Sequence, residues 1–258
     1  MTAVCMRNCV MRTQIGQELP IAFSSIGASL MPWDPVWEKV FTSQAWGRYP
    51  GEDLIRFVAR NYFATPERGK VRFLEVGCGT GTNLWFLARE GFSASGIEGS
   101  TAAASIARQR LDSECPTWSA APCNGELVVG DMTTLAWPDD HFDALIDSEA
   151  VYCSDFEESC RIYREMFRVG KRGGKLFVRT FATGTWGDGA GTAIGRGRFV
   201  ADAGPMAGKG PSRFTAEAEL SELLGPWRIN EVNLITRSLD AQRHAIREWI
   251  VEAEKVHE

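Results

Sequence analysis

The sequence lacks the long hydrophobic runs, the basic excess and the export signal that mark membrane-bound, nucleic-acid-binding or secreted proteins. No apolar run approaches the roughly 20 residues that a membrane helix needs, and no continuous hydrophobic segment of the secretory kind follows Arg7 and Arg12. Asp and Glu number 33 against 28 Lys and Arg, so the net charge is −5, whereas nucleic-acid binders usually show a basic face. We therefore expect a cytoplasmic protein with neither a membrane nor a nucleic-acid partner.

Histidine is scarce and cysteine is scattered. The seven cysteines are an odd number without an export signal, which favours reduced thiols over disulfides. Cys5 and Cys9 form no CxxC pair and have no histidine partner, so no metal site is predicted. His141 lies in a turn that leads into a predicted strand. Neither the order nor the context of the residues suggests a Ser-His-Asp arrangement, so we do not expect one.

Hydrophobic periodicity predicts an α/β fold. Apolar runs typical of strands alternate with helical patterns along the middle of the chain. This alternation indicates βαβ units and a Rossmann-like, mostly parallel, seven-stranded sheet with helices on both faces, ending in an antiparallel strand pair. The predicted strands cover 71–76, 92–97, 127–129, 142–146, 175–181, 227–237 and 245–253, and the predicted helices cover 34–41, 52–62, 82–90, 101–111, 157–169 and 214–224.

The chain length of 258 residues fits a single domain with an elaboration. We expect a flexible N-terminal arm over 1–30 and one domain over 31–258. Nine of the residues from Gly184 to Gly210 are glycine, which predicts a mobile loop that meets the substrate, with Trp186 and Arg179 nearby in the sequence. The domain is expected to divide into a helical cap at 31–66, a cofactor-binding core at 67–182, a glycine-rich lid loop at 183–213, and a C-terminal helix and strands at 214–258.

The strongest motif is the segment LEVGCGTG, Leu74 to Gly81, at a strand end that opens a helix. Glycine is needed where a backbone turns tightly and a ligand approaches closely, and the helix N-terminus beyond supplies free N–H groups. A dinucleotide site calls for GxGxxG. Here the third glycine comes one residue early, at Gly81, and Thr82 stands at the expected position. The motif therefore departs from the dinucleotide pattern.

In its strand-and-helix context, this segment resembles the first motif of the class I S-adenosylmethionine-dependent methyltransferases. The resemblance covers about 71–181 and implies S-adenosylmethionine as the cofactor. Glu98 ends the next predicted strand, 21 residues after Gly77, where an acidic side chain meets ribose hydroxyls. By the same resemblance, Asp131 accepts from the adenine amino group and the Met132 amide meets the ring edge.

Further segments extend the resemblance. FDALIDSEAVY, residues 142–152, resembles the family's fourth strand, whose end lies beside the sulfonium and the acceptor. It implies that Asp147 and Glu149 are negative neighbours of a cationic cofactor. The segment WEKVFTSQAWGRYP is similar to a cap found in some bacterial small-molecule methyltransferases, and this likeness implies that Arg48 and Tyr49 reach over the cofactor, where a guanidinium suits a carboxylate.

These observations predict a methyltransferase that acts on a small molecule, most simply on an oxygen of a sugar or secondary metabolite. A general base is needed only where the acceptor must lose a proton. A homodimer is compatible with the sequence. Two alternatives stay open: an NAD(P)-dependent oxidoreductase on the same sheet type, and a non-catalytic interaction module. The predicted catalytic residues are Glu149, Asp147 and Tyr152, and the predicted cofactor-binding residues are Arg48, Tyr49, Glu75, Gly77, Cys78, Gly79, Asn83, Glu98, Gly99, Ser100, Asp131, Met132 and Asp147.

Overall fold

The computed structural model describes residues 35–256. The predictions that concern the arm at 1–30, including Cys5 and Cys9, lie outside the described residues. Five cysteines within the described range are free thiols, in line with the expectation of reduced cysteines.

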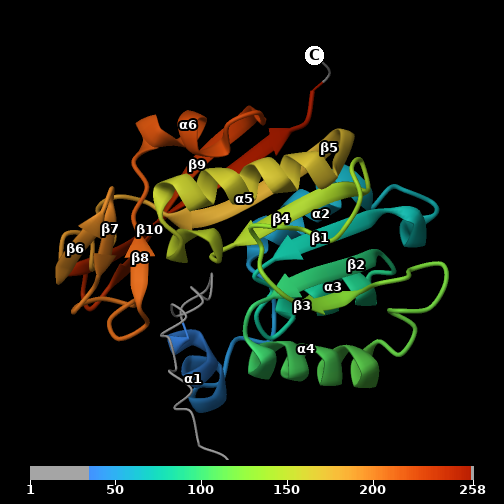
Figure 1. Cartoon of the computed structure of the whole chain (residues 1–258), viewed down its shortest axis with the longest axis horizontal. Coiled ribbons are helices and arrows are strands. Elements are labelled where there is room, and N and C mark those ends of the chain that lie inside the picture. The colour runs from blue at the N-terminus through green and yellow to red at the C-terminus, as the bar shows by residue number, and fades with distance from the viewer. Residues whose placement is uncertain (1–34, 257–258) are drawn as a thin grey trace, which may run out of the picture. The chain divides into compact units, whose positions relative to one another are not determined.

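A seven-stranded sheet forms the centre of the described fold, in the order β3-β2-β1-β4-β5-β10-β9 (Figure 1). The strands β1 to β5 run parallel, and β10 runs antiparallel to both β5 and β9. This confirms the predicted mostly parallel sheet with a terminal antiparallel pair. The strands are β1 (Arg72–Val76), β2 (Ser93–Glu98), β3 (Leu127–Val129), β4 (Phe142–Ser148), β5 (Gly170–Phe181), β9 (Arg228–Leu239) and β10 (His244–Glu254).

Helices cover both faces of this sheet, because successive strand residues point to opposite sides. Phe73 packs in a buried cluster with α2, α3 and α4, while its neighbour Leu74 packs in another cluster with α5 and α6. The order of strands changes direction between β1 and β4, and ligands bind at the carboxyl ends of strands at such a point. The helices are α1 (Val36–Ser43), α2 (Glu52–Tyr62), α3 (Thr82–Arg89), α4 (Thr101–Glu114), α5 (Phe156–Val169) and α6 (Leu220–Leu224), with 3₁₀ turns η1 (Arg68–Lys70), η2 (Val151–Cys153) and η3 (Glu217–Glu219).

The glycine-rich segment at 183–213 contains a small antiparallel sheet rather than a lid loop alone. Its strands are β6 (Thr192–Gly195), β7 (Arg198–Val200) and β8 (Pro211–Arg213). Gly191 and Gly197 have φ angles of +80° and +61°, which glycine adopts without strain. The glycines therefore permit the turns of a small sheet within the segment that was predicted to be a mobile lid loop.

The predicted helix at 214–224 is also shorter than expected. Thr215 does not cap a helix: its amide donates to the Phe181 carbonyl at 2.9 Å, and the residue forms a parallel bridge with Ala182. The Trp249 indole donates to the Thr215 carbonyl at 2.8 Å. Because these contacts hold the backbone extended, helical structure begins only at η3 and α6.

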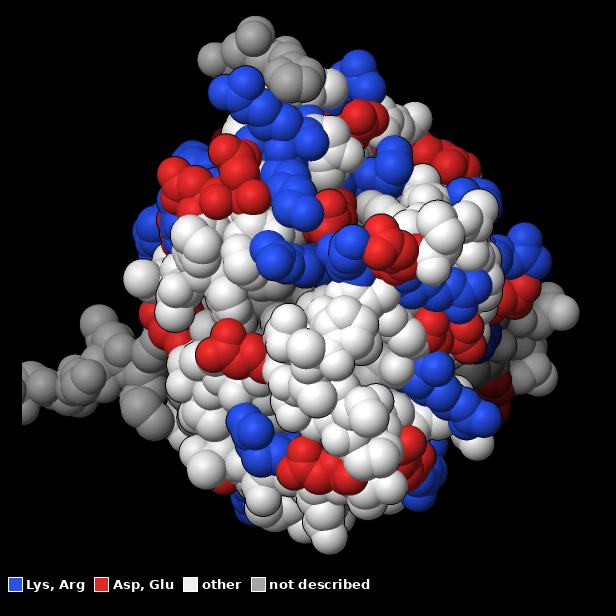
Figure 2. Space-filling model, turned by 90° about the vertical axis from the view of Figure 1, so that its right-hand side faces the viewer, with Lys and Arg blue, Asp and Glu red and all other residues white. Residues whose placement is uncertain are grey.

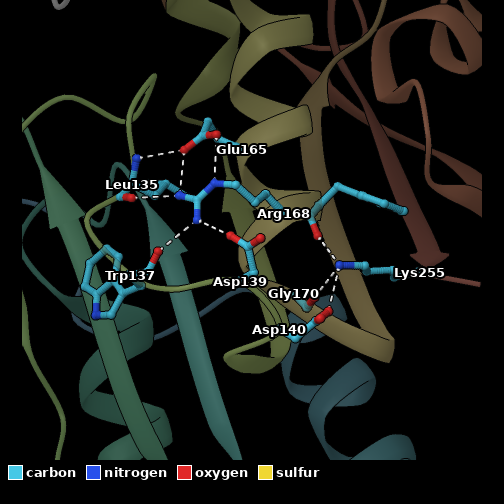
Figure 3. Close-up of polar contacts among 9 residues, drawn as sticks. Leu135, Trp137, Asp139, Asp140, Glu165, Arg168, Gly170 and Lys255 are labelled. Atoms are coloured by element: carbon cyan, nitrogen blue, oxygen red, sulfur yellow. Dashed lines mark hydrogen bonds and ion pairs between the residues drawn. The ribbon is translucent and has the colours of Figure 1, made fainter.

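Arg168 and Lys255 make contacts at the amino ends of β4 and β5, opposite the carboxyl ends of the strands (Figure 3). The Arg168 guanidinium donates to the carbonyls of Leu135 and Trp137 and forms ion pairs with Asp139 and Glu165. The Lys255 ammonium donates to the carbonyls of Phe167 and Gly170 and to Asp140. These contacts tie α5, β5 and the end of β10 to the segment before β4.

Candidate active site

The loop between β1 and α3 turns tightly at three glycines. Gly77, Gly79 and Gly81 have φ angles of +59°, +51° and +73°. The Cys78 amide donates to the Ile97 carbonyl at 3.1 Å, which holds the loop against β2. A Cβ atom on Gly77 would collide with the Ala150 side chain, and one on Gly81 would lie 2.7 Å from Cβ of Ala107. Only glycine fits both places, because the Ala150 and Ala107 side chains pack directly against the loop backbone.

Three buried carboxyl groups surround this loop: Glu75 on β1, Glu98 on β2 and Asp147 on β4. One oxygen of Glu75 accepts from the Asn83 amide at 2.6 Å, and the other oxygen is buried without a partner among the described residues. Burial raises the pKa of Glu75 to about 8, the charges of Asp147 and Glu98 add to this, and the Asn83 hydrogen bond opposes it. Burying an acceptor without a hydrogen-bond partner costs free energy. The free oxygen of Glu75 is therefore a place for a hydrogen-bond donor or a positive charge of a ligand.

Glu98 holds the loop and the start of α4 together. Its two oxygens accept from the amides of Gly79 at 2.7 Å and Ser100 at 2.8 Å. Burial raises the pKa of Glu98, while the hydrogen bonds from the amides of Ser100, Gly79 and Gly99 lower it. Each carboxylate oxygen has more than one lone pair, so Glu98 retains the capacity to accept from a ligand.

Glu38 on α1 is a contact that sequence reasoning missed. Its carboxylate accepts from the Ser100 hydroxyl at 2.6 Å and from the Ala102 amide at 3.0 Å, at the N-terminus of α4. The predicted helical cap at 31–66 therefore contacts the start of α4 through α1, which lies beside it in Figure 1. Nothing in the local sequence distinguishes Glu38 from another exposed glutamate of an amphipathic helix.

Asp147 is fully buried and bonded within the protein. One oxygen accepts from the amides of Ala150 and Val151 at 3.0 and 3.1 Å, and the other accepts from the Tyr163 hydroxyl at 2.6 Å. Burial raises the pKa of this carboxyl, and the three hydrogen bonds oppose the rise. Asp147 therefore shapes the turn after β4, and its roles as a general base and a cofactor ligand remain predictions.

Glu149 occupies a strained position in the same turn. Its φ angle is +58°, which costs a non-glycine residue about 1–2 kcal/mol, and such strain clusters at functional sites. The Glu149 carboxyl lies 3.8 Å from Nε of Arg179 and hydrogen-bonds the Glu248 carboxyl. Burial and the Glu248 hydrogen bond raise the pKa of Glu149, and Arg179 opposes them.

Glu248 on β10 and Arg179 on β5 complete this group. The Arg179 guanidinium donates to both oxygens of Glu248, at 3.0 and 2.8 Å. Glu248 was absent from the predicted site, although a glutamate within the apolar run of a predicted strand is an unusual burial and could have drawn attention to it. The Glu149 and Glu248 carboxyls therefore lie beside the same guanidinium.

Tyr152, a predicted catalytic residue, lies in an apolar cluster. The Tyr152 side chain is 3% exposed and packs edge-on against Phe181, and its hydroxyl lies 3.6 Å from the Met206 sulfur. Burial raises the pKa of the hydroxyl. Its surroundings favour packing beneath the small sheet over a role as a base.

The Arg48 and Tyr49 side chains are largely exposed and contact α4 and α3. The Arg48 side chain is 66% exposed and pairs with Glu114 at 2.5 Å, at the far end of α4 from Ser100. Tyr49 is 73% exposed and meets the Trp85 ring edge-on. A carboxylate distant in sequence thus holds the Arg48 guanidinium, and the roles of Arg48 and Tyr49 at the cofactor remain predictions.

The remaining predicted residues lie at the ends of β1, β2 and β3. Cys78 is buried under the loop, and burial raises the pKa of its thiol. Gly99 links Glu98 to the cap residue Ser100. The Asp131 carboxylate accepts from the amide and hydroxyl of Thr133, and Met132 packs on the core. Asp131 therefore shapes its own turn at the end of β3.

A metal-ligand cluster and a membrane-spanning helix are both absent from the described part of the chain. Residues 35–256 contain no group of three or more His, Cys, Asp or Glu side chains placed to hold a metal ion. Within the same range, no helix is long and apolar enough to cross a membrane.

Comparisons with known proteins bear on the domain family and the fold. Residues 73–174 match the family model of a methyltransferase domain. A search of curated proteins gives no match. The fold is similar to that of an S-adenosylmethionine-dependent methyltransferase from Methanosarcina mazei, with a TM-score of 0.60 and 24% identity over 72% of this chain and 93% of that one.

Two other solved structures share the fold. The 1,6-didemethyltoxoflavin-N1-methyltransferase of Burkholderia thailandensis has a TM-score of 0.55 and 14% identity, over 86% of this chain and 88% of that one. The [4+2]-cyclase SpnF has a TM-score of 0.60 and 20% identity, over 87% and 93%. The fold and the glycine loop thus define a Rossmann-like methyltransferase domain. Residues 73–174 therefore contain a methyltransferase domain whose fold is shared with S-adenosylmethionine-dependent methyltransferases, and S-adenosylmethionine is the cofactor that this match supports.

Proposed function

We propose that this protein transfers a methyl group to an oxygen atom of a small molecule, of the sugar or secondary-metabolite class. The observation that carries the proposal is the Glu149–Glu248 carboxyl pair beside Arg179, at the turn that follows β4. A hydroxyl acceptor must lose a proton, and a base serves best when its pKa lies near the ambient pH. Burial raises the pKa of Glu149 in that direction.

The residues around the glycine loop fit the cofactor. Glu75, Glu98 and Asp147 place three carboxyl groups at the end of the sheet, and one buried oxygen of Glu75 has no partner among the described residues. A sulfonium or ammonium group nearby would favour the charged form of these carboxyls, whereas the pyrophosphate of a nicotinamide dinucleotide would disfavour it. The early third glycine also disfavours the dinucleotide.

The cofactor supplies a methyl group on a positively charged sulfur that is already a good leaving group. The protein then has to orient the reactants, exclude water and hold the acceptor's proton. Glu98 would accept from ribose hydroxyls, and the backbone at Gly77 and Gly79 would lie against the ligand. Glu75, held by Asn83, would face a cationic group, and Asp131 and Met132 would meet the adenine.

A small-molecule acceptor has two lines of support. The Burkholderia thailandensis neighbour was solved with bound 1,6-didemethyltoxoflavin and S-adenosylhomocysteine. In addition, positive and negative side chains are interspersed on the face that Figure 2 shows, and a polyanion needs a patch of one sign. SpnF, a [4+2]-cyclase, shares this fold, so the fold alone does not define the reaction. The reaction has to be established from the residues of the site.

Turnover provides the test. The full chain is incubated with S-adenosylmethionine and a panel of hydroxylated small molecules, and S-adenosylhomocysteine is quantified by mass spectrometry. We expect Glu149→Gln to lose turnover while its S-adenosylhomocysteine affinity stays close to that of the wild type. Glu157→Gln, at an exposed position of α5, is the matched control. Unchanged turnover in Glu149→Gln would contradict the role of the pair. Stabilisation by NAD and none by S-adenosylmethionine would contradict the function itself.

A further inference from the structure

The small sheet places two arginines directly opposite each other. Arg198 on β7 pairs with Arg213 on β8 in the antiparallel register, so both side chains leave the same face. Like charges at such opposed positions are destabilising. Arg213 is 1% exposed, and a buried charge usually has a partner of opposite sign.

Neither arginine has such a partner. Among residues 35–256, no carboxylate lies within ion-pair distance of Arg198 or Arg213, whereas the neighbouring Arg196 pairs with Glu219 and Glu222 at 2.7 and 2.8 Å. Both Arg198 and Arg213 also have a buried Nε atom without an acceptor in the described range.

The existing contacts of the two guanidinium groups are all with neutral atoms. Arg198 donates to the Cys153 carbonyl at 2.8 Å. Arg213 donates to the hydroxyls of Thr215 and Ser159 at 2.7 and 3.2 Å. Two fixed positive charges therefore lie against the η2 turn and the start of α5 without local neutralisation.

The nearby acids are engaged elsewhere. Asp155 caps α5 by accepting from the Glu158 amide at 2.7 Å. Asp147, whose charge is felt at Arg213, is bonded to the Tyr163 hydroxyl and to two amides. The positive charge at Arg198 thus remains available to a ligand.

This charge lies next to the proposed site. Cys153, the contact of Arg198, is four residues beyond Glu149 in the turn that leaves β4. Arg198 as a whole is partly buried, whereas Arg213 is fully buried, so Arg198 is the more accessible residue of the pair. A ligand with a hydroxyl near Glu149 can extend along the η2 turn toward Arg198.

We propose that Arg198 binds an anionic group of the methyl acceptor, a carboxylate or a phosphate, with Arg213 as a second fixed positive charge behind it. A guanidinium matches both groups because its planar fork donates two parallel hydrogen bonds. This inference rests on the proposed function and narrows the acceptor to an acidic small molecule. A role of Arg198 solely as a clamp between the small sheet and the η2 turn is the competing explanation.

The test measures anion binding without the acceptor. The full chain is titrated by calorimetry with sodium phosphate and, separately, with sodium acetate, each at constant ionic strength balanced by chloride, and thermal midpoints are recorded in parallel. Each titration is done with and without S-adenosylhomocysteine. The variants are Arg198→Gln, Arg198→Lys and the control Arg196→Gln, whose arginine is already paired with two carboxylates.

We expect the wild type and Arg196→Gln to bind at least one of the two anions. Arg198→Gln should weaken that binding about 10- to 100-fold, the size of one charge-assisted hydrogen-bond pair, and Arg198→Lys should retain part of it. A response to acetate identifies a carboxylate site, and one to phosphate identifies a phosphate site.

Equal anion binding in Arg198→Gln and wild type, or no anion binding by the wild type, would overturn the inference. A clamp alone would lower the thermal midpoint of Arg198→Gln equally with and without the anion. Cofactor affinity keeps the two proposals distinguishable: loss of S-adenosylhomocysteine binding by the wild type would contradict the proposed function, whatever the anion result.

Discussion

Replacement of Glu98 is the most direct perturbation of the proposed cofactor site. Glu98→Ala removes a buried carboxylate that accepts from the amides of Gly79 and Ser100, and that we expect to accept from two ribose hydroxyls. A hydrogen bond to a charged group contributes about 1.5–3 kcal/mol. Loss of two such bonds to the ligand corresponds to about 3–6 kcal/mol, or an affinity about 10²- to 10⁴-fold weaker.

Isothermal titration calorimetry with S-adenosylhomocysteine measures this loss directly. Because Glu98 also fixes the loop and the start of α4, Glu98→Gln serves as a second variant that keeps the side-chain volume. It should bind more weakly than wild type and more tightly than Glu98→Ala. Glu149→Gln, on the acceptor side, should leave this affinity nearly unchanged.

Equal affinity of the wild type and Glu98→Ala would refute the reasoning. So would a loss of the same size in Glu149→Gln, because the two carboxyls lie on different strands and the proposal gives them different partners.

Three further predictions concern stability. The pKa of Glu75 is about 8 in place of its ordinary 4.5, so the folded state holds an extra proton between pH 4.5 and 8. The free energy of unfolding should therefore fall as the pH rises through this range. Glu75→Gln should reduce this pH dependence, as measured by urea denaturation. Gly77→Ala should lower the thermal midpoint more than Gly91→Ala, because both glycines have positive φ but only Gly77 would collide with a neighbour; equal shifts would show that the collision is relieved. Arg168→Met should lower the free energy of unfolding by about 1–3 kcal/mol in chemical denaturation, because it leaves two carbonyls without a donor. Arg161→Met, at an exposed position, should lower it little. Similar losses in the two variants would argue against a stabilising role of the cluster in Figure 3.

Local patterns predicted the parts of the fold that depend on neighbouring residues. The helix over 52–62 was predicted with the bounds that α2 has, and each predicted strand of the main sheet is present. The glycine loop and the position of Glu98 could be predicted for the same reason: the backbone turn and the strand end are encoded in a few consecutive residues. Whether Glu98 binds the cofactor remains a prediction.

Contacts between distant residues could not be predicted in this way. Arg48 pairs with a carboxylate 66 residues later, and no property of its own segment reveals that partner. Asp147 lies in a motif rich in acidic residues, yet it accepts a hydrogen bond from Tyr163 on α5, 16 residues further along the chain. In the glycine-rich segment, the exposed strand β6 has no buried face, so no alternation of hydrophobic residues marks it.

Strand β10 joins β9 to β5 of the main sheet. It follows β9 in the chain but lies between β5 and β9, so β9 cannot reach the sheet through any other strand. During synthesis, β1 to β5 can pair as they emerge from the ribosome, whereas Arg179 must wait for Glu248. The carboxyl pair proposed as the base is therefore among the last contacts to form, and a nascent chain gains it only when nearly all of the described fold has been made.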